Sequence, residues 1–474
     1  MNTKRILALV LALLMVFSLT ACGGPEEEEV EYQYDYEYVS GEQTGNNQTG
    51  NNQTGNNQTG NKQTTENDLP MKGVNLADLK GKTVRYATWK DPKENEDGIV
   101  VDSFQEKYGI KVKIDYIQEG EYVKKISGLI SSGKDIPDVF FCNETFPACL
   151  KCLDPISKTK IDLDNAIWDK TFSDYFTING DTYLVNTVGN IWNETDMLFY
   201  NKKVLIEAGY SDPDATIQAL IDQGKWTFET LTTMMQAIKN YDSSYIPAFL
   251  QPAPIICSTG ANWFKFSDGK FTQSFDSTLY DATKQLAQWK MAGLVSTNMN
   301  DMSHYFTYDK MGFAVTNAWG LKATGYYGGI MGKKMDPNNI GFTYIPDMSA
   351  SHKAVATGKA RGYGLVRGAS EPEAAGAFLC YYLDVNNYDC STTFISKKAE
   401  TFFFNVTDRA RLANQNFYNM DGLGIEGVAG SAFAFAESAP ANVEKEMKAA
   451  IPQFNNVVNQ LNQNIIADLA GANR

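Results

Sequence analysis

The segment 81–89, GKTVRYATW, has the alternating pattern of a half-buried β-strand. A second alternating segment, IKVKIDY at 110–116, follows apolar residues that recur at helical spacing between 99 and 108. Apolar residues at helical spacing then lead to Gly133, and DVFF at 138–141 has the composition of a buried strand. This order of strand, helix, strand, helix and strand predicts a parallel sheet with crossover helices, so we expect an α/β fold.

The region before this fold lacks the composition of a hydrophobic core. Residues 26–29 are all glutamate, residues 31–38 alternate acids and glutamine with tyrosine, and the unit QTGNN repeats from 43 to 61. Polar, glycine-rich repeats cannot bury enough apolar surface to offset the entropy of ordering them. We therefore predict that 22–72 is a disordered linker, although the alternating tyrosines leave a short strand open. A flexible chain of about 45 residues spans roughly 35–40 Å, which is enough for a tether.

The first 22 residues have the pattern of an exported, lipid-anchored protein. Lys4 and Arg5 precede an apolar run at 6–17, which is too short to span a bilayer because a span needs about 20 apolar residues. Leu-Thr-Ala-Cys at 19–22 resembles a bacterial lipobox, whose cysteine receives the lipid. We expect residues 1–21 to be removed, Cys22 to be lipidated, and the protein to sit at the extracellular face of the cell membrane. An ordinary secretory peptide with a chance cysteine is the alternative.

The charge of the chain argues against nucleic acid as a partner. The 474 residues carry a formal net charge of −14, and loss of Lys4 and Arg5 with the signal peptide makes the mature chain more negative still. Such a surface repels phosphate backbones, and the sequence has no basic stripe that would overcome this repulsion.

The cysteines and histidines do not form a recognisable metal site. Six cysteines follow Cys22, and an even number outside the cell permits disulfides with fifteen connectivities, or else six buried thiols: Cys142, Cys149, Cys152, Cys257, Cys380 and Cys390. The CxxC motif at 149–152 has no second CxxC, and His304 and His352 have no ligand spacing. We therefore expect no metal and no cofactor.

Several segments in one order resemble the family 1 extracellular solute-binding proteins, the sugar-capturing lipoproteins of ABC importers that are related to the maltose-binding protein. The resemblance begins with the strand and helix pattern of 88–139 and continues in four later segments: DTYLV at 181–185, LFYNK at 198–202, DKMGFAV at 309–315 and GYGLV at 362–366. KWTFETL at 225–231 departs from the family's Thr-Trp-x-x-Leu segment, because its tryptophan and threonine are exchanged.

This resemblance implies a periplasmic-binding-protein-like fold of two α/β lobes, each a sheet flanked by helices, with the ligand in the cleft between them. Lobe 1 would comprise 73–186 plus 342–366, and lobe 2 would comprise 187–341 plus 367–474. Residues 443–447 and 457–466 read as amphipathic helices late in the second lobe. The resemblance also implies a monomer without enzymatic activity that delivers its ligand to an ABC transporter permease.

Open parallel sheets bind ligands at the carboxyl ends of their strands, and this rule together with the family pattern selects the candidate binding residues. They lie after the strands near 88, 141, 249 and 315, in the expected hinge loop 190–194 and at the last crossing. The candidates are Trp89, Lys90, Asp91, Asn143, Glu144, Trp192, Asn193, Glu194, Gln251, Trp319 and Arg361.

These residue types favour a carbohydrate, because aromatic rings cover the C–H faces of a sugar while carboxylates and amides bond its hydroxyls. We expect an oligosaccharide. Each candidate also has a structural reading, since a tryptophan at the end of a strand often packs in the core. For Trp226 and Trp289 we prefer that structural reading.

Other functions fit the sequence less well. A tethered glycan-degrading enzyme would need a pair of carboxylates, and acids are abundant, but the sequence has no Gly-x-Ser-x-Gly motif and two isolated histidines. A surface adhesin that binds glycan without import is compatible with the linker. A binding protein for a polyamine or a peptide is also open, and an amine would suit the acidic chain.

Overall fold

The computed structural model describes residues 68–89, 97–118, 121–142, 145–298, 301, 305–306, 308–321, 336–384, 387, 396–404, 416–418 and 434–472. Residues 1–67, which include the expected signal peptide, Cys22 and the QTGNN repeats, lie outside the described part of the chain. Within the described part of the chain, none of the helices has both the length and the apolar character needed to cross a bilayer.

The first sheet contains the strands that the opening segments predict. Its order is β2-β1-β3-β15-β4, with bounds β1 Thr83–Thr88, β2 Lys111–Tyr116, β3 Val139–Cys142, β15 Gly362–Val366 and β4 Leu153–Asp154. β1 pairs in parallel with β2 and β3, whereas β15 runs antiparallel to β3 and β4. The crossover helices are α2 (Asp97–Tyr108) and α3 (Tyr122–Ser132), and α3 ends at Gly133, whose φ of 65° is the left-handed conformation of a helix C-cap. The predicted α/β arrangement is confirmed here.

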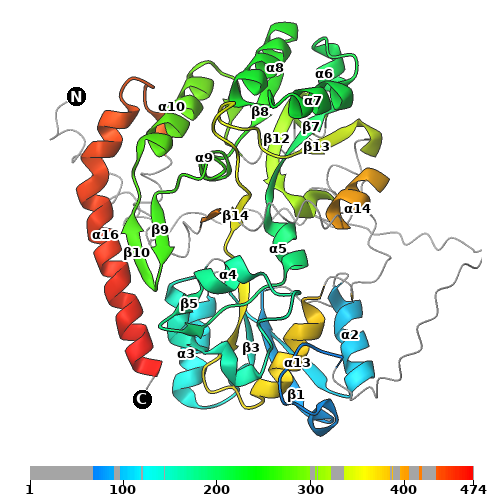
Figure 1. The fold of residues 1–474 in the computed structure, drawn as a ribbon, viewed down its shortest axis with the longest axis vertical. Coiled ribbons are helices and arrows are strands. Elements are labelled where there is room, and N and C mark those ends of the chain that lie inside the picture. Colours follow the sequence, from blue (N-terminus) through cyan, green and yellow to red (C-terminus); the bar gives the residue numbers. More distant parts are fainter. Residues whose placement is uncertain are drawn as a thin grey trace, which may run out of the picture. The chain divides into compact units, whose positions relative to one another are not determined.

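Helix α13 (Pro372–Tyr382) covers one face of this sheet (Figure 1). The ring of Phe378 lies 5.4 Å from that of Tyr86 on β1 and 5.5 Å from that of Phe104 on α2. The sequence analysis placed 367–474 with the second lobe, and for α13 that placement was wrong. The helix is apolar on nearly every side, so it has no stripe in its sequence that indicates which sheet it covers.

The second sheet has the order β11-β8-β12-β7-β13. Its strands are β11 Val295–Ser296, β8 Ile246–Phe249, β12 Met311–Asn317, β7 Asp196–Asn201 and β13 Ile340–Thr343. β8 is parallel to β11 and β12, whereas β7 is antiparallel to β12 and β13. The helices that follow these strands in sequence are α6 (Lys202–Glu207), α7 (Pro213–Asp222), α8 (Phe228–Tyr241) and α10 (Ser277–Met291) (Figure 1).

Trp226 and Trp289 are structural, as predicted. They are 5% and 1% exposed, and both pack in the core beside the second sheet. The indole nitrogen of Trp226 donates to the main-chain oxygen of Tyr344 at 3.1 Å, and that of Trp289 donates to Thr232 Oγ1 at 2.7 Å. Each buried indole N–H is therefore satisfied.

Two chain segments run between the sheets. One leads from Val185, which bridges to Tyr363 of β15, through α5 (Val188–Glu194) into β7. The other leads from β13 back to β15 through β14 (Thr357–Lys359), which pairs with β16 (Asn416–Tyr418). Thr195 and Gly358 bridge these two segments to each other.

A third group of elements packs around aromatic side chains. It comprises α4 (Lys170–Tyr175), β5 (Thr177–Ile178), β6 (Asp181–Thr182), the hairpin β9 (Phe264–Ser267) and β10 (Lys270–Gln273), and α16 (Val443–Ala472). Phe146 lies 5.0 Å from Phe266 and 4.8 Å from Phe176, ring to ring. α16 runs along β10 and is one helix through Pro452, where the sequence predicted two separate segments (Figure 1).

The remaining helices are α9 (Pro252–Cys257), α14 (Lys397–Phe404), η1 (Leu76–Leu79), η3 (Ala148–Cys152), η4 (Ile156–Thr159), η6 (Ala318–Leu321), η7 (Pro337–Asn339) and η10 (Phe435–Glu437).

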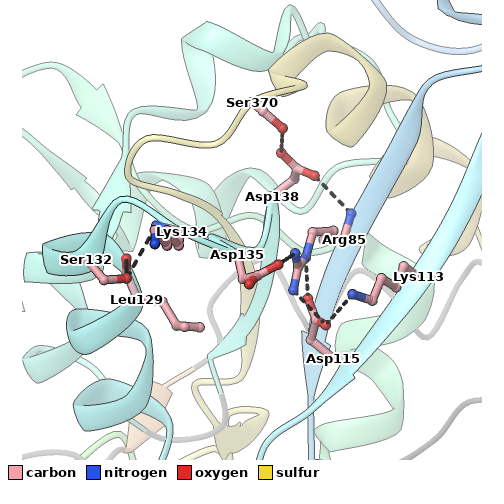
Figure 2. A network of polar contacts seen from close by, with 9 residues as sticks. All are labelled: Arg85, Lys113, Asp115, Leu129, Ser132, Lys134, Asp135, Asp138 and Ser370. Atoms are coloured by element: carbon pink, nitrogen blue, oxygen red, sulfur yellow. Dashed lines mark hydrogen bonds and ion pairs between the residues drawn. The ribbon is translucent and has the colours of Figure 1, made fainter.

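Polar contacts around Arg85 fix the strands of the first sheet against each other (Figure 2). Arg85 Nε donates to Asp115 Oδ2 on β2 at 2.8 Å, and Arg85 Nη1 donates to Asp135 at 2.5 Å. Asp138 is fully buried and accepts from the main-chain nitrogens of Arg85 at 2.9 Å and Glu371 at 3.0 Å. This carboxylate thereby ties β1 to the start of β3 and to the segment that begins α13.

Candidate ligand site at two sheet edges

The carboxyl ends of three strands lie at one edge of the first sheet. Because β1 is parallel to β2 and β3, the residues that follow these strands emerge at the same edge. Thr88 is in register with Tyr116, and Trp89 follows directly. β15 runs the other way and pairs Gly362 with Cys142, so Arg361 lies at this edge as well.

Two aromatic side chains at this edge face solvent. Trp89 is 37% exposed and Tyr116 is 61% exposed, whereas Tyr86, on the same strand as Thr88, is 2% exposed. The exposed rings lie at the edge where ligands of open α/β sheets bind.

The second sheet collects a corresponding set of residues. β8, β11 and β12 are parallel, so Gln251, Asn298 and Trp319 come after strands that end at one edge. β7 begins at this edge, because Asp196 is in register with Asn317, the last residue of β12. The segment that enters β7 from α5 therefore reaches the same edge.

Gln251 and Arg361 lie where the sequence analysis expected them, at the end of β8 and before β15. Gln251 is half-buried and is the N-cap residue of α9. Arg361 is half-buried, and its main-chain oxygen accepts from Asn186 Nδ2 at 2.8 Å. Arg361 is thus attached to the first of the two segments that run between the sheets.

The expected hinge loop at 190–194 is a helix, so that part of the sequence analysis was wrong. α5 covers Val188–Glu194, and Thr187 begins it: its hydroxyl accepts from the main-chain nitrogen of Asn190 at 3.2 Å. Ile191 is 1% exposed, and its burial anchors the helix. Trp192, Asn193 and Glu194 belong to this helix, and their side chains lie outside the described residues.

The other candidates fall partly or wholly outside the described part of the chain. Trp319 belongs to η6, directly after β12, but its side chain is not described. Lys90, Asp91, Asn143 and Glu144 lie outside the described residues, as does Cys22. Of the eleven candidates, the structure therefore gives side-chain surroundings for Trp89, Gln251 and Arg361.

Two residues at these edges were missed by the sequence analysis. Tyr116 is the last residue of β2, and the rule that selected Trp89 would have selected it too. Asn317 is the last residue of β12, and its Oδ1 is buried with no hydrogen-bond donor among the described residues. Unmet buried acceptors are rare in folded proteins, so Asn317 marks the β12 end as unusual. No sequence signal distinguishes it from other strand-terminal asparagines.

Within the described ranges, no group of three or more histidine, cysteine, aspartate or glutamate side chains is placed to hold a metal ion. Burial raises the pKa of the Cys257 thiol on α9, with a smaller contribution from the nearby Asp196, so this sulfur stays protonated.

Comparison with known proteins agrees with this geometry. The profile of the family described as "Bacterial extracellular solute-binding protein" matches residues 100–388. No relative is found among curated proteins.

Three solved structures with a similar fold illustrate the likeness. The galacto-N-biose/lacto-N-biose I-binding protein of an ABC transporter from Bifidobacterium longum, in complex with lacto-N-biose, has a TM-score of 0.58 at 13% identity, over 79% of this chain and 97% of that one. The GacH receptor of Streptomyces glaucescens, solved unliganded and with acarbose, has a TM-score of 0.56 at 15% identity, over 79% and 98%. An extracellular solute-binding protein from Staphylococcus aureus with maltose has a TM-score of 0.54 at 17% identity, over 80% and 98%.

At these identities the likeness establishes the fold, and the profile establishes the family. The resemblance drawn from the sequence is confirmed: this chain belongs to the bacterial extracellular solute-binding proteins.

Proposed function

We propose that this protein is a lipid-anchored binding protein that captures an oligosaccharide outside the cell and passes it to an ABC importer. The observation that carries the proposal is the pair of exposed aromatic rings, Trp89 and Tyr116, at the ligand edge of an α/β sheet. Solved bacterial proteins of similar fold that contain a bound sugar support the choice of a carbohydrate as the ligand.

The chemistry of a sugar suits this edge. Its C–H faces stack on rigid aromatic rings, and ring stacking contributes about 0.5–1.5 kcal/mol beyond the area that it buries. Its hydroxyls need donors and acceptors, which Gln251 and Arg361 supply from the second sheet and from the last crossing. The neighbours in fold that were solved with acarbose and with lacto-N-biose favour an oligosaccharide as the ligand.

We propose that the two sheets mark two lobes that move about the segments between them. A ligand that touches both edges binds the closed arrangement better than the open one and therefore shifts the population towards it. The permease then recognises the closed arrangement, and the protein acts as a monomer. A binding role without turnover follows from this account.

The N-terminal segment supports the proposed location of the protein at the membrane. Lipidation of Cys22 anchors the mature chain at the extracellular face of the membrane, and the linker lets the folded part sample the space above it. Replacing Cys22 with serine should release the protein into the medium. Retention of the C22S protein in the membrane fraction would contradict the anchor but would leave the ligand proposal intact.

A thermal-shift panel identifies the ligand class. Mature protein is heated with mono- and oligosaccharides, with spermidine and with short peptides. A ligand at 100 times its dissociation constant stabilises the folded state by about 2.7 kcal/mol, which raises the Tm measurably. A shift with oligosaccharides alone supports the proposal. A shift with spermidine or peptide alone, or release of shortened sugars from a bound glycan, would overturn it.

A further inference from the structure

Three of the cysteines lie together beside the end of β3. Cys142 is the last residue of β3, and Cys149 and Cys152 belong to η3. All three side chains are fully buried, and all three are thiols in this structure. The Sγ of Cys142 donates to the Sγ of Cys149 at 3.0 Å.

The contacts distinguish one pair from the others. Cys152 Sγ lies 3.2 Å from Ser127 Oγ and donates to the main-chain oxygen of Val123 at 3.6 Å, so it is engaged with α3. The CxxC spacing in the sequence would favour a bond between Cys149 and Cys152, whereas the geometry places Cys149 against Cys142. Cys257 on α9 and Cys380 on α13 are buried in other elements, and Cys390 lies outside the described residues.

We propose that Cys142 and Cys149 form a disulfide when the exported chain folds in contact with a disulfide oxidant. A disulfide needs its sulfurs at about 2.05 Å, so the two Sγ atoms have to approach by about 1 Å from their present contact. The two residues are joined by only the short segment 143–148, and the main-chain nitrogen of Cys149 already donates to the oxygen of Thr145 at 3.0 Å. The chain from Thr145 to Cys149 thus forms one turn, and the Sγ of Cys149 at its end meets the Sγ of Cys142.

The reaction is thiol–disulfide exchange with a small-molecule or protein disulfide, RSSR. One protein thiol loses its proton, and the thiolate attacks RSSR to give a mixed disulfide and one RS⁻. The second protein thiolate attacks the protein sulfur of the mixed disulfide and releases the other RS⁻. Two protein thiols are oxidised, one RSSR is reduced, and the two protons end on two RSH.

The timing of the reaction follows from burial. Exchange requires a thiolate that RSSR can reach, and both sulfurs are fully covered in the folded chain. Burial, and next the contact with Cys142, also raise the pKa of the Cys149 thiol well above its ordinary value. Oxidation therefore takes place while the chain folds, and the folded dithiol resists it.

The bond would act beside the candidate ligand edge. The segment that it closes carries Asn143 and Glu144, two of the predicted binding residues. A covalent closure at its base limits the conformations of this segment. The proposal does not depend on the identity of the ligand, because the bond is detected without one.

Mass spectrometry tests the proposal on the mature chain. One sample is denatured, reduced and refolded with reduced and oxidised glutathione, and a second, folded and reduced, receives the same glutathione mixture. We expect the refolded sample to lose about 2 Da, to yield a peptide pair joined through Cys142 and Cys149, and to gain about 2–4 °C in Tm over its reduced form. The sample that was folded first should stay reduced for much longer.

Three serine variants separate the possible pairings. C142S and C149S should each abolish the bond, whereas C152S, which removes a neighbouring buried thiol, should keep it. A bond between Cys149 and Cys152, loss of the bond in C152S alone, or a fully reduced chain after oxidative refolding would each overturn the proposal. Because the readout is the bond itself, failure here leaves the proposed sugar binding standing, and failure of sugar binding leaves this proposal standing.

Discussion

The side-chain amide of Asn186 donates to the main-chain oxygen of Arg361 at 2.8 Å and so joins the two segments that run between the sheets. Asn186 is 1% exposed, and its Oδ1 accepts from the main-chain nitrogen of Thr187 at 2.9 Å and from Asn190 Nδ2 at 2.7 Å. A buried amide with this many partners fixes the path of both segments. The lobe motion that we propose would take place about this contact.

Asn186→Ala should lower the free energy of unfolding by about 1–3 kcal/mol, because it leaves the Arg361 oxygen without its donor in a buried place. Urea unfolding of both proteins measures the difference. Asn240→Ala is the control, since Asn240 is exposed on α8 and its Oδ1 accepts from Gln236 on the same helix. Equal midpoints for the two variants would contradict the role of Asn186.

Asp138→Ala should be one of the most destabilising changes in the first sheet. The variant removes a buried acceptor, so the main-chain nitrogen of Arg85 (Figure 2) loses its acceptor. The main-chain nitrogen of Glu371 loses the same acceptor. We expect a loss of about 2–4 kcal/mol in the free energy of unfolding, measured by urea titration. Asp164→Ala serves for comparison, because the Asp164 side chain is 89% exposed and pairs with the exposed Lys72. An equally large loss in the free energy of unfolding of the Asp164 variant would contradict the role of burial at Asp138.

Gly269→Ala should weaken the contact between the β9–β10 turn and β5. A Cβ at this position would lie 2.6 Å from Ile178 Cγ2, and the residue has a φ of 73°. Gly260 has a φ of 79° and nothing within 4 Å of an added Cβ. Gly260→Ala should therefore lower the free energy of unfolding only by the cost of the left-handed backbone, about 1–2 kcal/mol. The Gly269 variant should lose about 1–3 kcal/mol more, read as a lower Tm. If the two variants have the same Tm, the close approach to Ile178 does not contribute to stability.

Tyr245 should make stability fall at alkaline pH. Burial, and next the hydrogen bond that its hydroxyl donates to Glu207, raise the pKa of Tyr245 to about 12. The folded state therefore holds the phenol proton more tightly than the unfolded state, whose tyrosine titrates near pH 10. Stability from this group is complete below pH 10 and is lost as the pH rises from about 10 to about 12.

Tyr245→Phe tests this dependence. At pH 8 the variant should unfold at lower urea than the parent, by about 1–2 kcal/mol, because a bond to a charged acceptor is lost. Between pH 10 and pH 12 the difference should shrink, since phenylalanine has no proton to lose. If the difference in the free energy of unfolding between the two proteins stays constant from pH 10 to pH 12, Tyr245 is not the group that causes the loss of stability.

The strands of the first sheet could be predicted from sequence because their hydrophobic period follows from local geometry. The alternation at 81–89 and 110–116 and the terminator Gly133 depend on neighbouring residues alone. α5 was missed because seven residues with few apolar side chains form a helix only when Thr187 begins it and Ile191 is buried. The position of α13 depends on packing that a uniformly apolar helix does not encode.

The candidate site could be predicted in part, since a residue after a strand is found once the strand is known. Trp89 and Gln251 were selected in this way, whereas Arg361 was selected because it lies at the last crossing. Tyr116 was counted as part of its strand, and its exposure depends on its place at the end of the edge strand β2. The approach of Cys142 to Cys149 depends on how η3 returns to the end of β3, and the sequence left all fifteen disulfide connectivities open.

Calorimetric titration of the mature protein with the oligosaccharide found in the thermal-shift panel tests the central claim most directly. Trp89→Ala and Tyr116→Ala should each weaken binding about 10-fold or more, because each loses a stacking surface worth at least about 1.4 kcal/mol. Tyr241→Ala, which removes an equally exposed ring from the end of α8 just before the amino end of β8, should leave the affinity unchanged. Parent affinity in both edge variants, or an equal loss in the Tyr241 variant, would contradict the account.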